Sequence, residues 1–308
     1  MNKKSTLQKI RFVFIIAAII ILVAAICYTA YYLISSKKSK ALYDDTVAGF
    51  VSARNPNEQS GSGYVHGETA GNGSANINGG ATGNYDDDSV SGGAAGSDGM
   101  GTLSGSDVQE NETVTIDWSY CPITVDFKGL QAVNPDIVGW IYCPNTLINY
   151  PIVSGEDNSF YLDHNYTGGA SKGGAIFADC GNSGDFSDGN TIIYGHHMID
   201  GTMFSGLGKW SNQSYMNMYP YMWLLTPDCT YRIEIFSAYT TTADSEAYRI
   251  FSLTDSTREE YISRAIAASG ISSAVIPGDE DRLILLSTCA YVFKDARSVV
   301  HGRLVPWN

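Results

Sequence analysis

The segment Leu285–Val305, LLSTCAYVFKDARSVVHGRLV, contains two apolar runs separated by a polar connection. The first run ends at Cys289 and the second begins at Arg297. Short apolar runs bounded by polar residues predict two antiparallel strands that pair as a hairpin. In such a hairpin the end of the first strand lies beside the start of the second, so we expect Cys289 and Arg297 at the same end.

Distance along the second strand then decides which polar residue can serve Cys289. At about 3.3 Å per residue, His301 lies about 13 Å and Arg303 about 20 Å farther along than Arg297. His301 is therefore too far from Cys289 for direct proton transfer. Arg297 is preferred over Arg303 as the cationic partner of the thiol.

The same short-strand pattern continues upstream. Segments rich in β-branched and aromatic residues are separated by clusters of Gly, Asn, Asp and Pro; they are Gly139–Cys143, Tyr150–Val153, Gly174–Phe177, Asn190–Gly195, Tyr221–Leu225 and Tyr231–Tyr239. Helical spacing occurs over 126–133 and, after a capping-box pattern at Ser256–Glu259, up to Ala268. Many short strands with few helices predict a mainly β fold, interpreted as a mixed β-barrel with one helix at its start and one in a late loop.

The N-terminal region contains the run Phe12–Ile34, which carries no formal charge. As a helix this run is roughly 35 Å long, enough to cross a hydrocarbon core. Tyr28, Tyr31 and Tyr32 fit an aromatic belt at one interface. A cleaved signal peptide is the alternative, but its apolar core is usually about 7–15 residues long. We predict an uncleaved anchor over 12–34, with residues 1–11 as a cytoplasmic tail and the rest of the chain outside.

Residues 35–112 are rich in Gly, Ser, Asn and Asp, and His66 lies among them. Most of this segment cannot bury enough apolar surface to offset its ordering entropy, so it is predicted to be a flexible linker. Some 70 residues of such coil span about 45 Å. The sequence therefore predicts a tether that lifts a folded domain, residues 113–308, off the membrane.

Charge and cysteine content restrict the function classes. The formal net charge of −13 argues against nucleic acid as the main partner. The folded region has an odd number of cysteines and no CxxC or metal-like spacing; they are Cys121, Cys143, Cys180, Cys229 and Cys289. The thiol left unpaired indicates either a free nucleophile or a reducing habitat.

His196 and His197 directly follow the apolar run Thr191–Gly195, where a strand is expected to open into a loop. A histidine and a cation make a thiol a better nucleophile, and a guanidinium can stabilise an oxyanion, so Cys, His and Arg are sufficient for thioester chemistry. Local features alone leave other interpretations open: Cys289 as a core thiol, the histidine pair as a metal site, and Arg297 as a solvated edge residue.

Taken together in order, the segments resemble the sortases, membrane-anchored cysteine transpeptidases of Gram-positive bacteria, and most closely class B. The matching segments, between about Val125 and Val305, are Asn134–Ile141, Asn149–Val153, Gly174–Asp179, Asn190–Met198, Gly201–Phe204, Leu286–Cys289 and Arg297–Val305. The late helix agrees as well, because class B sortases carry a long helix between the sixth and seventh strands. The resemblance implies a sortase-type eight-stranded β-barrel over residues 113–308.

The resemblance also implies a mechanism. Cys289 would cleave a C-terminal sorting motif of an exported protein after Thr through a thioacyl-enzyme. His196, the first histidine of the pair, would act as general acid and then base, and Arg297 would hold the substrate and the oxyanion. The acceptor would be an amine of a peptidoglycan stem or its lipid-linked precursor, with no metal or cofactor.

Further residues are placed only by their position in the resemblance. The residues expected to line the substrate groove are Asn158, Leu162, Tyr194, Ser287 and Thr288. Ala290 departs from the class B pattern, which often has an acidic residue just after the cysteine, so no carboxylate assistance is expected there. Two alternatives to the transpeptidase are a membrane-anchored cell-wall cysteine hydrolase and a non-catalytic surface binding module.

Overall fold

The structure is a computed structural model that describes residues 3–54, 116–290 and 292–307. Residues 55–112 of the predicted linker, including His66, lie outside the described residues, as do 113–115 at the predicted start of the folded domain.

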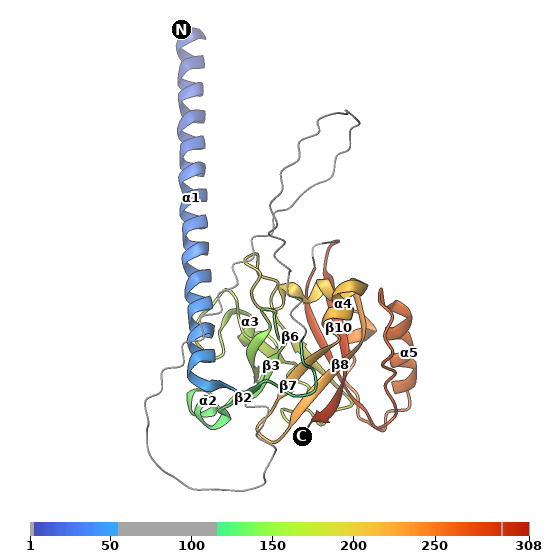
Figure 1. Ribbon diagram of the computed structural model, residues 1–308. Helices are drawn as coiled ribbons and strands as arrows, with labels where there is room; N and C mark the ends of the chain where they lie inside the picture. The colour runs from blue at the N-terminus through green and yellow to red at the C-terminus, as the bar shows by residue number, and fades with distance from the viewer. Residues whose placement is uncertain (1–2, 55–115, 291, 308) are drawn as a thin grey trace, which may run out of the picture. The chain divides into compact units, whose positions relative to one another are not determined.

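Eight strands close into a barrel in the order β10-β8-β7-β3-β4-β5-β6-β9 (Figure 1). Their bounds are β3 Ile137–Tyr142, β4 Asn149–Ser154, β5 Ile176–Ala178, β6 Asn190–Tyr194, β7 Tyr221–Leu225, β8 Thr230–Thr242, β9 Arg282–Cys289 and β10 Ala296–Trp307. Most neighbours pair antiparallel, but β4 pairs parallel with β5 and β6 parallel with β9. The predicted mainly β, mixed eight-stranded barrel is confirmed.

Strand register brings three chain segments to one end of the barrel. The β9–β10 hairpin has the predicted antiparallel pairing, with Arg297 opposite Cys289. β6 runs parallel to β9, with Tyr194 opposite Ser287. The end of β6, the end of β9 and the start of β10 therefore lie together.

The two faces of β9 pack against different groups of side chains. Ile284 and Leu286 belong to the main core inside the barrel, while Leu285 packs with Ile192 and Val299 in a separate cluster. Residues of the long connection between β8 and β9 cover this second cluster from outside. Because side chains alternate along a strand, Ser287 and Cys289 share the outer face with Leu285.

Six helical segments lie along the chain after residue 116: α2 Phe127–Val133, α3 Phe160–Asp163, η1 Ser205–Ser211, α4 Gln213–Met218, η2 Glu246–Tyr248 and α5 Arg258–Ala268. Both predicted helices are present, and α5 lies between β8 and β9. Asp126 caps α2 by accepting from the Gly129 N–H. The predicted capping box of α5 is wrong: Thr257 is the N-cap and makes no side-chain cap hydrogen bond, because its hydroxyl donates to the Asp255 carboxylate instead.

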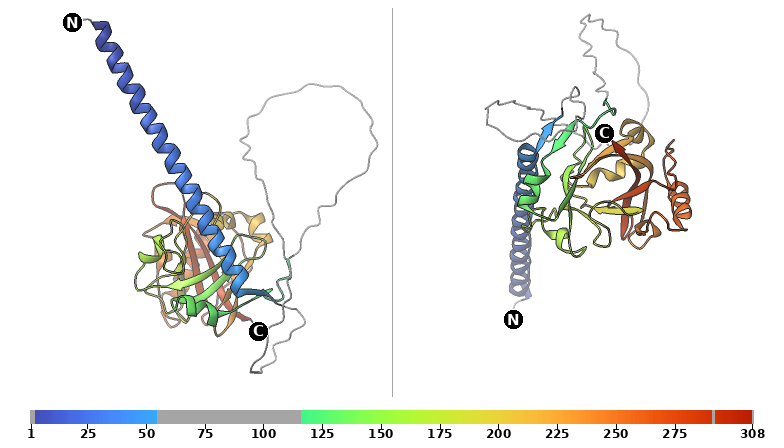
Figure 2. Two further views of the ribbon diagram at one scale, coloured as in Figure 1. Left: turned by 90° about the vertical axis from the view of Figure 1, so that its left-hand side faces the viewer. Right: turned by 90° about the horizontal axis from the view of Figure 1, so that it is seen from below.

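The first helix, α1, runs from Lys3 to Phe50, and β1 (Val51–Ala53) follows it directly. A stretch of α1 has a mean hydropathy of 2.6 with no residue buried in the protein, long and apolar enough to cross a membrane. β1 pairs antiparallel with β2 (Ile123–Val125), as Figure 2 shows. Residues 35–53, assigned to the linker from composition, are thus helix and strand.

Side chains at helical spacing explain why α1 continues past its lysines. Tyr43 is buried and donates its hydroxyl to the carbonyl of Gly174 at 3.0 Å. Thr46 is buried beside the Tyr166 hydroxyl at 2.5 Å. This packing stabilises the last turns of α1. The β1–β2 pairing in turn joins the end of α1 to the start of the barrel domain.

Candidate active site

Cys289 and Arg297 form a directly opposed pair at the open end of the β9–β10 hairpin. The Cβ atoms of such a pair lie about 4.5–5.5 Å apart and on the same face of the sheet. A bond of 2.8 Å from the Ala290 N–H to the Ala296 carbonyl closes the hairpin just beyond them. Both side chains are half-buried, and the Arg297 Nη1 donates to the Ala296 carbonyl at 3.0 Å.

The histidine pair follows the end of β6, beside the same end of β9. The Gly195 N–H donates to the Ser287 carbonyl at 3.1 Å, which extends the parallel ladder past Tyr194. Continuing this register by two residues puts His196 level with Cys289 and on the same face. The structure thus brings the three predicted catalytic residues to one end of the barrel.

Each histidine ring has a backbone partner. His196 Nε2 lies 2.6 Å from the carbonyl oxygen of Leu162, and His197 Nδ1 lies 2.9 Å from that of Cys289. Since a carbonyl oxygen only accepts, both nitrogens carry protons. In its neutral form His196 then has its lone pair on Nδ1, which is the atom able to accept a proton.

Gly174 permits the close approach of the loop that faces His196. Its φ is +57°, and a Cβ there would lie 2.5 Å from the Tyr161 carbonyl and 3.1 Å from the His196 ring. Any other residue would be strained and would displace one of these neighbours. The loop carrying Leu162 is therefore held against the imidazole by a glycine.

A polar network occupies the outer face beside this site. Asp179 accepts hydrogen bonds from the Tyr194 hydroxyl at 2.8 Å and from Asn158 Nδ2 at 2.9 Å. Burial raises the pKa of Tyr194, and the hydrogen bond to Asp179 raises it further. Asp179 was missed by sequence reasoning, although an acidic residue directly after an apolar strand was a usable signal.

Ser287 is joined to the connection that covers this face. The Tyr248 hydroxyl from η2 lies 2.8 Å from the Ser287 hydroxyl, and the Tyr194 and Tyr248 rings stack with centroids 6.1 Å apart. Tyr248 therefore lies beside the site on the outer face of β9, a position that no local sequence pattern indicated. Burial raises the pKa of Tyr248, and its hydrogen bond to Ser287 lowers it.

Thr288 is separated from the other predicted groove residues. It is buried and lies between Ser287 and Cys289, so its side chain points to the opposite face of β9. Its hydroxyl has no hydrogen-bond partner among the described residues. Asn158, Tyr194 and Ser287 lie on or next to the outer face, whereas Leu162 reaches His196 through its backbone.

His301, His164 and Arg303 make contacts within the fold and away from the Cys289–Arg297 pair. His301 is fully buried, with Nε2 3.1 Å from the Tyr239 hydroxyl, and burial lowers its pKa to about 3. Arg303 pairs with Glu234 and Asp281. His164 stacks on Phe160. The sequence-based exclusion of His301 and Arg303 agrees with these contacts.

Two of the other thiols are far more buried than Cys289. All six cysteines lie in the described part of the chain, and none is paired. Burial raises the pKa of Cys121 to about 11 and that of Cys143 to about 12, so both stay protonated. Cys289 is half-buried at a strand end, and Cys229 is half-buried at the β7–β8 turn.

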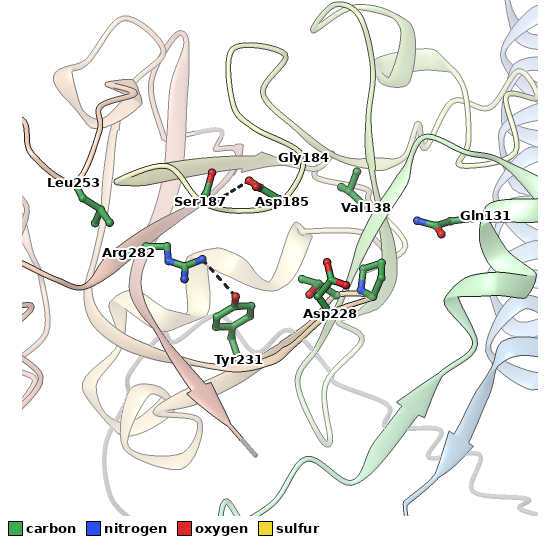
Figure 3. Close-up of a pocket in the computed structure, with 11 residues that line it drawn as sticks. Gln131, Val138, Gly184, Asp185, Ser187, Asp228, Tyr231, Leu253 and Arg282 are labelled. Carbon is green, nitrogen blue, oxygen red and sulfur yellow. Dashed lines mark hydrogen bonds between the residues drawn. The ribbon is translucent and has the colours of Figure 1, made fainter. Parts of the chain in front are cut away.

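Two observations limit other kinds of site among the described residues. No group of His, Cys, Asp and Glu side chains there could hold a metal ion. A pocket of about 570 Å³ lies beside Arg282 and Tyr231, at the start of β9 and β8 (Figure 3). Arg282 and Cys289 are the two ends of β9, so this pocket is at the end of the barrel away from Cys289.

Comparison with known proteins identifies this architecture. The sequence profile of the sortase domain matches residues 141–305. The chain is 36% identical over 182 residues to sortase B of Listeria monocytogenes and 33% identical over 181 residues to sortase B of Staphylococcus aureus. Each match covers 58% of this chain and 74% of the relative.

Solved structures agree in fold. The structure of a Staphylococcus aureus sortase B–substrate complex has a TM-score of 0.56 and 32% identity, covering 59% of this chain and 85% of that one. Sortase B of Bacillus anthracis, solved in complex with AAEK1, has a TM-score of 0.54 and 36% identity, covering 58% and 84%. The chain belongs to the sortase family of cysteine transpeptidases. Its relatives and structural neighbours place it in class B.

Proposed function

We propose that this sortase cleaves a C-terminal sorting motif of an exported protein after Thr and transfers the protein to a cell-wall amine. The register that opposes Arg297 to Cys289 carries the proposal. A neighbouring guanidinium favours the thiolate and is placed to stabilise the oxyanion of an acyl transfer. The solved relative with a bound substrate supports peptide binding by the same barrel.

In the first half-reaction Nδ1 of His196 takes the proton of the Cys289 thiol, and the resulting thiolate attacks the carbonyl carbon of the threonine. The peptide bond breaks, a thioester forms, and the leaving amine takes a proton from His196. In the second half-reaction an acceptor amine gives a proton to His196 and attacks the thioester. The carbon–sulfur bond breaks, a new amide forms, and the Cys289 thiolate is regenerated.

The roles of the surrounding residues follow from their positions. Arg297 holds the substrate carbonyl and the developing negative charge. Asn158, Leu162, Tyr194 and Ser287 line the groove for the motif, with Tyr248 closing its outer side. Thr288 contributes through its backbone, since its side chain is buried on the other face.

Helix α1 determines where in the cell the reaction takes place. Its apolar stretch anchors the protein in the cell membrane, with residues 1–11 inside and the barrel outside. The substrates are exported proteins bearing a sorting signal, and the acceptor is an amine of a peptidoglycan stem or of its lipid-linked precursor. No cofactor enters this chemistry, because the thiol, imidazole and guanidinium supply every proton and charge it needs.

The test is a ligation assay on the full-length protein in detergent, with a library of sorting peptides and an amine acceptor. We expect amine-dependent ligation product, a thioacyl-enzyme at Cys289 by mass spectrometry, and loss of both in Cys289→Ala. Cys229→Ala is the matched control, because that half-buried thiol lies at the β7–β8 turn, and it should retain activity.

Three results would contradict the proposal. Cleavage without any amine-dependent product would indicate a cysteine hydrolase, which passes the acyl group to water. Full activity in Cys289→Ala would show that Cys289 is not the nucleophile. No turnover of any peptide by the folded protein would indicate a non-catalytic surface binding module.

A further inference from the structure

The loops at the active-site end of the barrel contact α1 close to the end of its apolar run. Ser36 donates a hydrogen bond to the Asp200 carboxylate. The Lys172 ammonium lies 4.3 Å from the ring centroid of Tyr31 and 5.0 Å from that of Tyr28. Asp200 lies four residues after His196, and Lys172 two residues before Gly174, so both belong to loops that carry the site.

These contacts fix the height of the loops along the helix. The apolar run ends at Ile34, and a helix rises about 1.5 Å per residue. The Asp200 contact is therefore about 3 Å beyond the run, while the Lys172 contacts are about 4–9 Å inside it. The polar headgroup layer is roughly 5–8 Å thick on each side. Tyrosine rings and lysine side chains are the groups that occupy this layer.

Exposed apolar side chains lie on the loop of Asp200 and on two other loops of the barrel. Ile199 precedes Asp200 and is 85% exposed at the tip of a turn closed by the Gly201 N–H and the Met198 carbonyl. Leu147, in the β3–β4 turn, is exposed beside Gly201. Val292 and Phe293 are exposed in the β9–β10 connection next to Cys289. An exposed apolar patch made by separate loops indicates an interaction surface.

Charge favours a lipid surface as the partner. The whole chain has a formal net charge of −13, which an anionic leaflet would repel. The contact region is different: Lys37, Lys38 and Lys40 follow the apolar run of α1, and Lys172 and Lys294 lie on the loops. Asp200 and Asp295 also lie on these loops, and Asp200 is held by Ser36. Apolar loop tips together with lysines are typical of segments that lie in a membrane interface.

We propose that the active-site end of the barrel lies on the bilayer, with Ile199 and Leu147 in the headgroup layer. The inference rests on the membrane anchoring proposed above. His197, whose ring contacts the Cys289 backbone, is three residues from Asp200, a chain distance of at most about 11 Å. The catalytic thiol therefore opens close to the membrane surface, where membrane-held substrates and a lipid-linked acceptor arrive laterally.

The test uses the full-length protein in nanodiscs containing phosphatidylglycerol, with p-benzoylphenylalanine in place of Ile199 or Ile276. Ile276 is the matched control: it is also an exposed isoleucine, at 73%, but it precedes the start of β9, about 23 Å from Cys289 along that strand. After illumination we expect at least tenfold more lipid adduct at position 199 than at 276, by mass spectrometry. Equal yields at the two positions, or none at 199, would overturn the proposal.

A third labelled position separates this inference from the proposed anchoring. Ile21 is exposed within the apolar run and should form lipid adducts whenever α1 spans the bilayer. Lipid adducts at position 21 without adducts at position 199 would reject only the proposal that the barrel lies on the bilayer. Absence of lipid adducts at position 21 would reject the proposal that α1 anchors the protein in the membrane. Peptide cleavage by the same samples in detergent reports the transpeptidase proposal independently.

Discussion

The Nδ1 atom of His197 lies 2.9 Å from the backbone oxygen of Cys289, while His196, one residue earlier, has its Nε2 atom 2.6 Å from the carbonyl of Leu162. Adjacent histidines thus serve opposite sides of the site. His197 holds the backbone of the nucleophile. His196 shares the face of the thiol by register and has Nδ1 available as the proton acceptor.

The two histidines should therefore differ in their kinetic contribution. His196→Ala should lower kcat/KM for a sorting peptide by about 10²- to 10⁴-fold, the usual range for a lost general acid–base group. His197→Ala should cost about 10-fold or less, because one hydrogen bond contributes about 1 kcal/mol. Single-turnover thioester formation measures both. A larger loss of kcat/KM in His197→Ala than in His196→Ala would indicate that His197, not His196, is the general acid–base group.

Arg297 and Arg303 lie on the same strand and provide a second matched pair. Arg297→Ala should lower kcat about 10²- to 10³-fold, since it removes the proposed oxyanion donor, with little change in the free energy of unfolding. Arg303→Ala should do the reverse, because Arg303 pairs with the buried Glu234 and with Asp281. We expect a loss of about 1–3 kcal/mol in urea unfolding with activity largely kept. Comparable activity losses in both variants would remove Arg297 from the reaction.

The β9–β10 hairpin was predictable because its partners are close in sequence, and strand spacing alone chose Arg297 over Arg303 and His301. The contact between the end of β6 and Cys289 could not be predicted, because β6 and β9 are far apart in sequence and neither strand carries a pattern that identifies its pairing partner. Family resemblance supplied that link. The helix through Tyr43 was missed because the glycine-rich composition of the following residues was extended back over it, and its contact with Gly174 joins residues far apart in sequence.

Asp179 offers a prediction about substrate binding. One oxygen of its carboxylate accepts from Tyr194 and Asn158, and the other accepts from the Gly181 N–H. Asp179→Ala releases Asn158 and Tyr194, two predicted groove side chains, and should raise KM for the sorting peptide about 3- to 10-fold, with a smaller change in kcat. Asp179→Asn should be intermediate, because its amide nitrogen would face the Gly181 N–H. An unchanged KM in Asp179→Ala would place this network outside the groove.

His301 predicts acid sensitivity of the fold. Burial lowers the pKa of His301 to about 3, whereas the unfolded side chain titrates near 6.5. Between these values the unfolded chain binds a proton that the native protein does not, so stability falls as the pH drops from 6.5 towards 3. At pH 5 this histidine alone should lower the free energy of unfolding by about 2 kcal/mol relative to pH 7.5.

His301→Gln loses the hydrogen bond and ring stacking to Tyr239, so it should be less stable at pH 7.5. Its stability should nevertheless change less between pH 7.5 and pH 5, by about that amount. Urea unfolding of both proteins at the two pH values measures the difference, and equal pH dependence would show that His301 is protonated in the folded protein.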